Sequence, residues 1–173
     1  GVGSGSTQAD FDAVQASYEE RFKTLPAYLD VMRRTWNEEP VYGNPISVWP
    51  GTEGGPPVLL GAWRSERWIN LAANQCQGWI SSGIHSSWDD LELGVKMYRN
   101  AGGGRAVLAN VFTDFGPNPE SGPSQHVPKV TLHCGLSEAR ERLRRMADIG
   151  LDDVLLVPPP NDPAQLERMS ELL

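Results

Sequence analysis

Cysteine, histidine and long hydrophobic runs are scarce in this 173-residue sequence, which holds 2 cysteines and 3 histidines. Cys76 and Cys134 have neither metal-site nor redox-motif spacing, so we expect two reduced packing residues. His126 and His133 have no partner at metal-ligand spacing, and we predict no metal site. No apolar run approaches the roughly 18 residues of a spanning helix, and we find no basic, apolar leader. We therefore expect a soluble, cytoplasmic protein that does not enter a membrane.

Positive charge is also in short supply, with 15 Lys and Arg against 22 Asp and Glu and a formal net charge of -7. A polyanion such as nucleic acid needs a local excess of basic residues, and this balance argues against one as a partner. The one basic run, at 138–145, interleaves its arginines with acids at helical spacing and predicts a solvated helix face. The length and the 39% hydrophobic content predict a single globular domain over 1–173.

After residue 57 the sequence alternates regularly between short apolar runs and segments with the apolar spacing of helices. The apolar runs predict strands at 57–63, 78–83, 105–112 and 153–159, with a further extended piece at 129–133. Helices are predicted at 65–75, 86–103, 137–150 and 162–173. Serines begin the first three helices, glycines end the middle two, and Asp followed by Pro begins the last. A loop rich in Gly, Pro, Asn and Ser runs over 116–128.

The first third of the chain has a different texture. Apolar residues at steps of three and four, from Tyr18 to Trp36, predict an amphipathic helix of about 18 residues. Pro26 lies within this stripe, so either the helix kinks there or a second helix begins there. An irregular connection over 37–57 follows, with a short extended piece at 46–49.

Continuous apolar strands joined by helices indicate a parallel sheet, either doubly wound or part of a (β/α)8 barrel. A complete barrel needs about 250 residues. The opening GVGSG, residues 1–5, has the pattern of a strand that ends in a loop. The chain thus fits an α/β fold that carries about the last four βα units of a barrel, with GVGSG as the tip of a strand that begins in a missing segment.

Four segments, in this order, resemble the luciferase-like monooxygenase family. They are GVGSG, FDAVQASYEERFKTLPAYLDVMRRTWNEEPV, PPVLLGAWRSERWINLAANQCQGWI and SEARERLRRMADIGLDDVLLVPP. Members of the family are (β/α)8 oxidoreductases that use a flavin or coenzyme F420. The resemblance aligns nearly the whole chain with the second half of the barrel, from the fourth strand onward, and implies FMN or F420 as cofactor.

The resemblance also implies cofactor-binding positions. Gly3, Ser4 and Gly5 would lie near the ring and phosphate, since glycines let the backbone approach a ligand closely. After the next strand the family has two glycines and small hydroxyl residues. Here the stretch reads Gly61, Ala62, Trp63, Arg64 and Ser65, in which Arg64 and the helix-start amides could hold an anion.

A family DGW motif that ends the sixth strand corresponds to Gln77, Gly78 and Trp79, with Gln in place of Asp. Trp79 is interpreted as barrel core or as a wall of the cofactor site. His85, in a polar loop at the carboxyl end of that strand, is a weak candidate for proton transfer.

Three functions follow from these observations. The first is an oxidoreductase that acts on a small organic substrate by hydride transfer or monooxygenation. The second is a half-barrel interaction module without catalysis, whose open sheet edges would favour a homodimer. The third is an inactive fragment. The sequence does not separate FMN from F420, and it does not identify the substrate.

Overall fold

The computed structural model describes residues 1–116, 128–160 and 162–172. The chain divides into two compact units, residues 2–58 and residues 59–173 together with Gly1, and each is described by itself. The single domain over 1–173 stays a prediction.

The unit of residues 2–58 contains two helices, α1 (Gln8–Ala13) and α2 (Arg21–Trp36). Helix α2 runs without interruption through Pro26, so no second helix begins there. Leu25 and Leu29 lie on its buried side. Helix α1 was not predicted, because its six residues lack an apolar stripe. The segment 46–49 is not part of a strand in the described part of the chain, and the extended piece expected there stays a prediction.

The unit of residues 59–173 is built on a parallel sheet, which confirms the α/β class. Its strands are β1 (Leu59–Gly61), β2 (Gly78–Ser82), β3 (Arg105–Asp114), β4 (Leu132–His133) and β5 (Asp153–Val157). The long strand β3 pairs with β2 on one side. On its other side β3 pairs first with β5 and then, at its carboxyl end, with the two residues of β4. The predicted extended piece at 129–133 thus contains the short strand β4.

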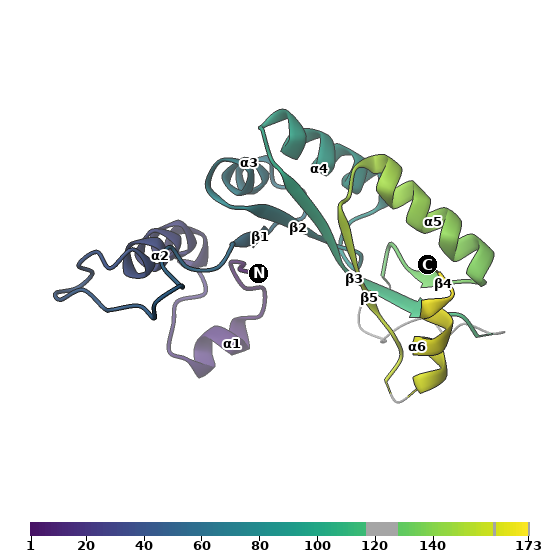
Figure 1. Ribbon diagram of the computed structural model, residues 1–173, viewed down its shortest axis with the longest axis horizontal. Helices are drawn as coiled ribbons and strands as arrows, with labels where there is room; N and C mark the ends of the chain where they lie inside the picture. Colours follow the sequence, from purple (N-terminus) through teal and green to yellow (C-terminus); the bar gives the residue numbers. More distant parts are fainter. Residues whose placement is uncertain (117–127, 161, 173) are drawn as a thin grey trace. The chain divides into compact units, whose positions relative to one another are not determined.

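Four helices accompany the sheet: α3 (Glu66–Gln75), α4 (Trp88–Asn100), α5 (Leu136–Ile149) and α6 (Pro163–Ser170). Helices α3, α4 and α5 lie along one face of the strands (Figure 1). Every predicted strand and helix of this unit is present, most with ends shifted by one or a few residues. The part of the loop 116–128 that covers 117–127 lies outside the described residues.

The helix starts follow the predicted chemistry only in part. Ser87 begins α4 through a capping box with Asp90, and Asp162 caps α6 by accepting a hydrogen bond from the Ala164 N–H. Ser65 stands at the predicted position before α3, but its side chain caps none of the described backbone groups. Helix α5 begins one residue earlier than predicted, after Gly135, so Ser137 lies inside its first turn.

One face of the sheet forms the core of this unit. Trp79 of β2 is fully buried and packs against α4, where a Cβ on Gly94 would lie 2.7 Å from the indole ring. Its neighbours in register, Leu60 and Ala106, are also fully buried. Register partners in a parallel sheet share a face, so these residues define the face covered by the helices.

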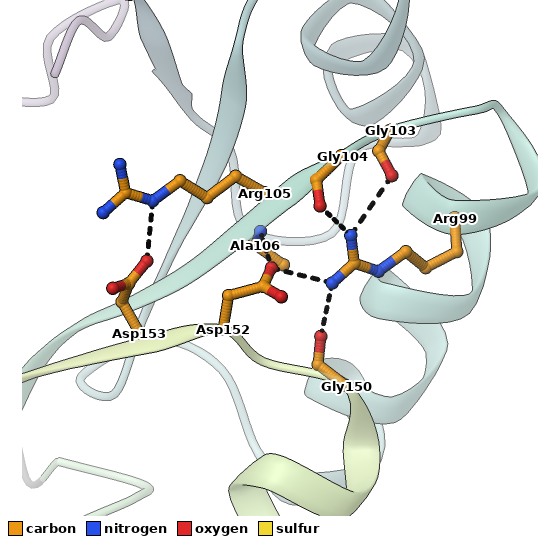
Figure 2. A network of polar contacts seen from close by, with 8 residues as sticks. All are labelled: Arg99, Gly103, Gly104, Arg105, Ala106, Gly150, Asp152 and Asp153. Atoms are coloured by element: carbon orange, nitrogen blue, oxygen red, sulfur yellow. Dashed lines mark hydrogen bonds and ion pairs between the residues drawn. The ribbon is translucent and has the colours of Figure 1, made fainter.

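A polar network ties the amino ends of β3 and β5 to the end of α4 (Figure 2). The Arg99 guanidinium donates to the Gly150 carbonyl at 2.8 Å, to Asp152 Oδ2 at 2.7 Å and to carbonyls of the turn after α4. The same Asp152 oxygen accepts from the Ala106 N–H at 2.7 Å. Burial opposes ionisation of Asp152, but its hydrogen bonds to Ala106 and Arg99 outweigh burial and lower its pKa.

We predict that Asp152→Ala lowers the free energy of unfolding by about 1 to 2 kcal/mol, since it leaves an Arg99 donor and the Ala106 N–H without their acceptor. The matched control is Asp153→Ala, whose ion pair with Arg105 is exposed on both sides, so this change should leave the free energy of unfolding nearly unchanged. Urea unfolding measures both. Because the folded pKa of Asp152 is depressed, its ionic contribution is complete above the unfolded pKa of about 4 and lost as the pH falls below that. Equal losses in the two variants would contradict the network's role.

Candidate functional site

Two loops meet at the carboxyl edge of β1 and β2, residues 62–65 and 83–87. The Trp63 and His85 rings stack there with centroids 3.8 Å apart and planes 23° apart. Trp63 is 45% exposed although it is a large apolar side chain. His85 is half-buried. The exposed Trp63 ring, backed by His85 at the carboxyl edge of parallel strands, offers a flat surface to a ligand.

Arg64 lies beside this pair. Its Nη1 is 3.8 Å from Asp90 Oδ1, and its side chain is 68% exposed. Asp90 is held mainly by the Ser87 backbone N–H, which lowers the pKa of the carboxyl against the effect of burial; Arg64 and Lys129 lower it further. The long contact and high exposure leave the guanidinium with donors for a further anion.

Helix α3 begins next to Arg64. The Trp68 and Ile69 N–H groups are the first in this turn to bond back to the Ser65 carbonyl. The N–H groups that precede them, over 65–67, have no carbonyl of the helix to bond. The positive end of a ten-residue helix and an exposed arginine therefore lie side by side.

Ala62 stands where the family pattern has the second of two glycines. Its N–H donates to the Ile80 carbonyl at 3.0 Å and its own carbonyl accepts from Trp79 Nε1 at 2.7 Å. Gly61, just before it, pairs with Ile80 in the sheet. Ala62 is thus fixed by backbone pairing, and only the residues after it are open to a ligand.

Gly78 and Trp79 lie at the amino end of β2, as the predicted strand at 78–83 has it, whereas the family's DGW motif ends its strand. A Cβ on Gly78 would meet the Arg105 carbonyl at 3.1 Å, so close packing between strands requires glycine there. Trp79 contacts α4 and holds the Ala62 carbonyl, as a core residue does. Their contact with a cofactor stays a prediction, although their observed contacts are those of packing.

Gly3, Ser4 and Gly5 belong to the unit of residues 2–58. Gly5 has a φ of +78°, and a Cβ there would lie 2.5 Å from the Phe11 ring. The local fold therefore requires glycine at this position whether or not a ligand binds. The cofactor contact of these three residues stays a prediction.

The remaining sequence candidates are the histidines and cysteines considered for a metal site. Among the described residues no three His, Cys, Asp or Glu side chains gather as a metal site. Burial lowers the pKa of His133 and raises that of the Cys134 thiol, as expected for packing residues. His126 lies outside the described residues.

Sequence reasoning missed two polar residues on the other face of the sheet, Ser82 and Asn110. Asn110 Nδ2 donates to Ser82 Oγ at 3.3 Å. The signal was present in the run RAVLANVF, where one asparagine interrupts an otherwise apolar strand.

The chain belongs to the luciferase-like monooxygenase family. The family's model, described as luciferase-like monooxygenase, matches residues 1–121. None of the curated proteins matches the chain.

Two solved structures have a similar fold. The crystal structure of the monooxygenase RslO1 from Streptomyces bottropensis superposes with a TM-score of 0.74 at 16% identity, over 99% of this chain and 66% of that one. The crystal structure of apo-MsnO8 gives a TM-score of 0.56 at 18% identity, over 89% of this chain and 58% of that one. The chain thus spans less than two thirds of each, and its fold is a partial (β/α)8 barrel. No helix in the described ranges is long and apolar enough to cross a bilayer.

We predict that Trp79→Phe lowers the free energy of unfolding by about 2 to 4 kcal/mol, because it removes the donor to the Ala62 carbonyl and leaves a gap beneath α4. Trp63→Phe, a matched change at an exposed tryptophan, should alter it by less than about 0.5 kcal/mol. Denaturant unfolding followed by circular dichroism compares the two. A stable Trp79→Phe variant would mean that the indole is not part of the core.

Proposed function

We propose that the chain is part of an oxidoreductase that uses FMN or coenzyme F420 for hydride transfer or monooxygenation of a small organic substrate. The observation that carries the proposal is the exposed Arg64 between the Trp63–His85 stack and the start of α3. A cation, open helix-start amides and a flat aromatic surface are the groups that a phosphate joined to a planar ring requires.

The residues present fit the phosphate end of such a cofactor. Arg64 is exposed and only loosely paired, and the amides over 65–67 are not used by the helix. Asp90, which pairs with Arg64, is also held by the Ser87 N–H, so an anion can bind Arg64 without leaving Asp90 unpartnered. Ala62 does not obstruct the loop, because its side chain is buried.

When bound, the cofactor supplies the hydride or activates oxygen, and the protein's task is to bind, orient and exclude water. Arg64 and the start of α3 would hold the phosphate. Trp63 would shield one side of the site from water. His85, fixed against Trp63 at the carboxyl edge of β2, is the residue we propose for proton transfer at an imidazole nitrogen.

Family membership and fold support this proposal. The family description names monooxygenases, and RslO1, which has the same fold, is described as a monooxygenase. Since both similar structures are longer than this chain, activity, substrate and cofactor choice belong to the proposal.

One observation favours a second function, a half-barrel module that associates through its sheet edge. Among the described residues β5 pairs only with β3, and Leu155 at its centre is 54% exposed. An open strand edge with an exposed leucine favours pairing with another strand. A homodimer could therefore form by pairing of the β5 edges of two chains.

We predict that Arg64→Ala weakens FMN or F420 binding by about 1.5 to 3 kcal/mol, roughly ten- to a hundredfold in Kd, because a charge-assisted contact to phosphate is lost. Arg67→Ala is the matched control, since Arg67 lies in the first turn of the same helix but over the Trp68 ring. Cofactor fluorescence titration measures both variants.

Unchanged affinity in Arg64→Ala would remove Arg64 from the site. A stable dimer that binds neither cofactor, seen by light scattering in the same samples, would favour the interaction module.

A further inference from the structure

Strand β3 contains a bulge at the point where Asn110 stands. Leu108 pairs with Val154 and Val111 with Leu156, so two residues of β3, Ala109 and Asn110, lie opposite the single Leu155. Asn110 has a φ of +58°, in the left-handed region that a residue other than glycine seldom adopts.

The bulge changes which residues of β3 lie beneath the helices. Before it the fully buried even-numbered residues Ala106 and Leu108 lie on the helix-covered face, and after it the odd-numbered Val111 and Thr113 are the fully buried ones. Without the extra residue, Asn110 would follow Leu108 onto the helix-covered face, and its carboxamide would be buried among apolar side chains. The bulge instead leaves Asn110 exposed.

The side chain of Asn110 lies on the opposite face of the sheet. It donates to Ser82 Oγ. Side chains alternate along β2, so Trp79 and Ser81 lie on the helix-covered face and Ser82 lies on the opposite one. Ser82 Oγ also accepts from the Ile84 N–H at 3.3 Å, so the acceptor that orients the carboxamide is itself held. Within the described residues, Asn110 Oδ1 has no hydrogen-bond partner.

We propose that Asn110 is a ligand-binding residue whose carboxamide recognises the polar edge of the cofactor ring. This inference rests on the proposed function. Oδ1, which no described residue bonds, and the second N–H of Nδ2 form an acceptor and a donor side by side, which complements the imide edge that the rings of FMN and F420 share. Such paired hydrogen bonds fix a ring's orientation as well as its affinity.

The position of Asn110 suits a ring whose phosphate is held by Arg64. Ser82 pairs with Ala109, so Asn110 stands level with the carboxyl end of β2. Strands β1 and β3 are second neighbours in the sheet, about 10 Å apart. The five-carbon ribityl chain that joins ring to phosphate in both cofactors can bridge that separation.

The variant Asn110→Gly tests the role of the carboxamide independently of that of the bulge. Glycine adopts a φ of +58° without strain, so the bulge and the stability should remain while the hydrogen-bonding group is lost. Gln15→Gly is the matched control, because Gln15 has a φ of 56° and is also exposed. The probes are FMN and riboflavin, which has the same ring but no phosphate, with F420 as a separate titrant.

We expect Asn110→Gly to raise the Kd of FMN and of riboflavin by the same factor, about tenfold, with an unchanged unfolding midpoint. Arg64→Ala should raise the Kd of FMN and leave that of riboflavin unchanged. Gln15→Gly should change neither Kd. If the wild-type chain binds F420 and no flavin, the same tenfold loss is expected for F420.

Equal cofactor affinity in Asn110→Gly and wild type would overturn the inference and leave the proposed function intact. A lower unfolding midpoint in Asn110→Gly would also overturn it, because the carboxamide would then be stabilising the fold. No binding of any probe by a folded wild-type chain would overturn the proposed function, and this inference with it.

Discussion

The pairing of β3 on both of its sides is the constraint on which the rest of the sheet depends. This strand is ten residues long, and it alone connects β2 to both β4 and β5. The side chains of β3 that pack beneath the helices must stay on that face, while the partner of the strand changes from β5 to β4. A single extra residue at Ala109–Asn110 shifts the phase of the side chains midway. That shift keeps the second half of the strand buried and allows one polar residue to face the other side.

The two ends of the sheet serve different purposes. At the amino ends, Arg99 and Asp152 tie α4, β3 and β5 together through hydrogen bonds to backbone groups (Figure 2). At the carboxyl ends, Arg64 and Trp63 are exposed and lightly held. In parallel α/β folds, ligands are bound by the loops at the carboxyl ends of the strands, and the hydrogen-bonded amino ends support those loops. Trp79 joins the two, because it fills the core under α4 and fixes the carbonyl of Ala62.

Much of this architecture could be predicted from sequence, because apolar runs such as those at β2 and β5 and cap residues such as Asp162 are local signals. Helix α1 could not, since its stability comes from contacts such as that of Phe11 with Tyr18 and not from a periodic stripe. The apolar run at 78–83 correctly placed Gly78 and Trp79 at the start of β2. The family motif, which ends a strand, does not hold that place here, because a motif fixes the order of residues but not their position in a strand. The Trp63–His85 stack and the bulge at Asn110 depend on neighbouring strands, and no local pattern encodes them.

We propose that the carboxyl edge of β1, β2 and β3 binds a cofactor with a flat ring and a phosphate. The most direct measurement is a fluorescence titration of the purified chain with FMN and with F420, with circular dichroism on the same sample to establish that the chain is folded. We expect saturable binding of one of the two cofactors at one site per chain. A folded chain that binds neither would contradict it.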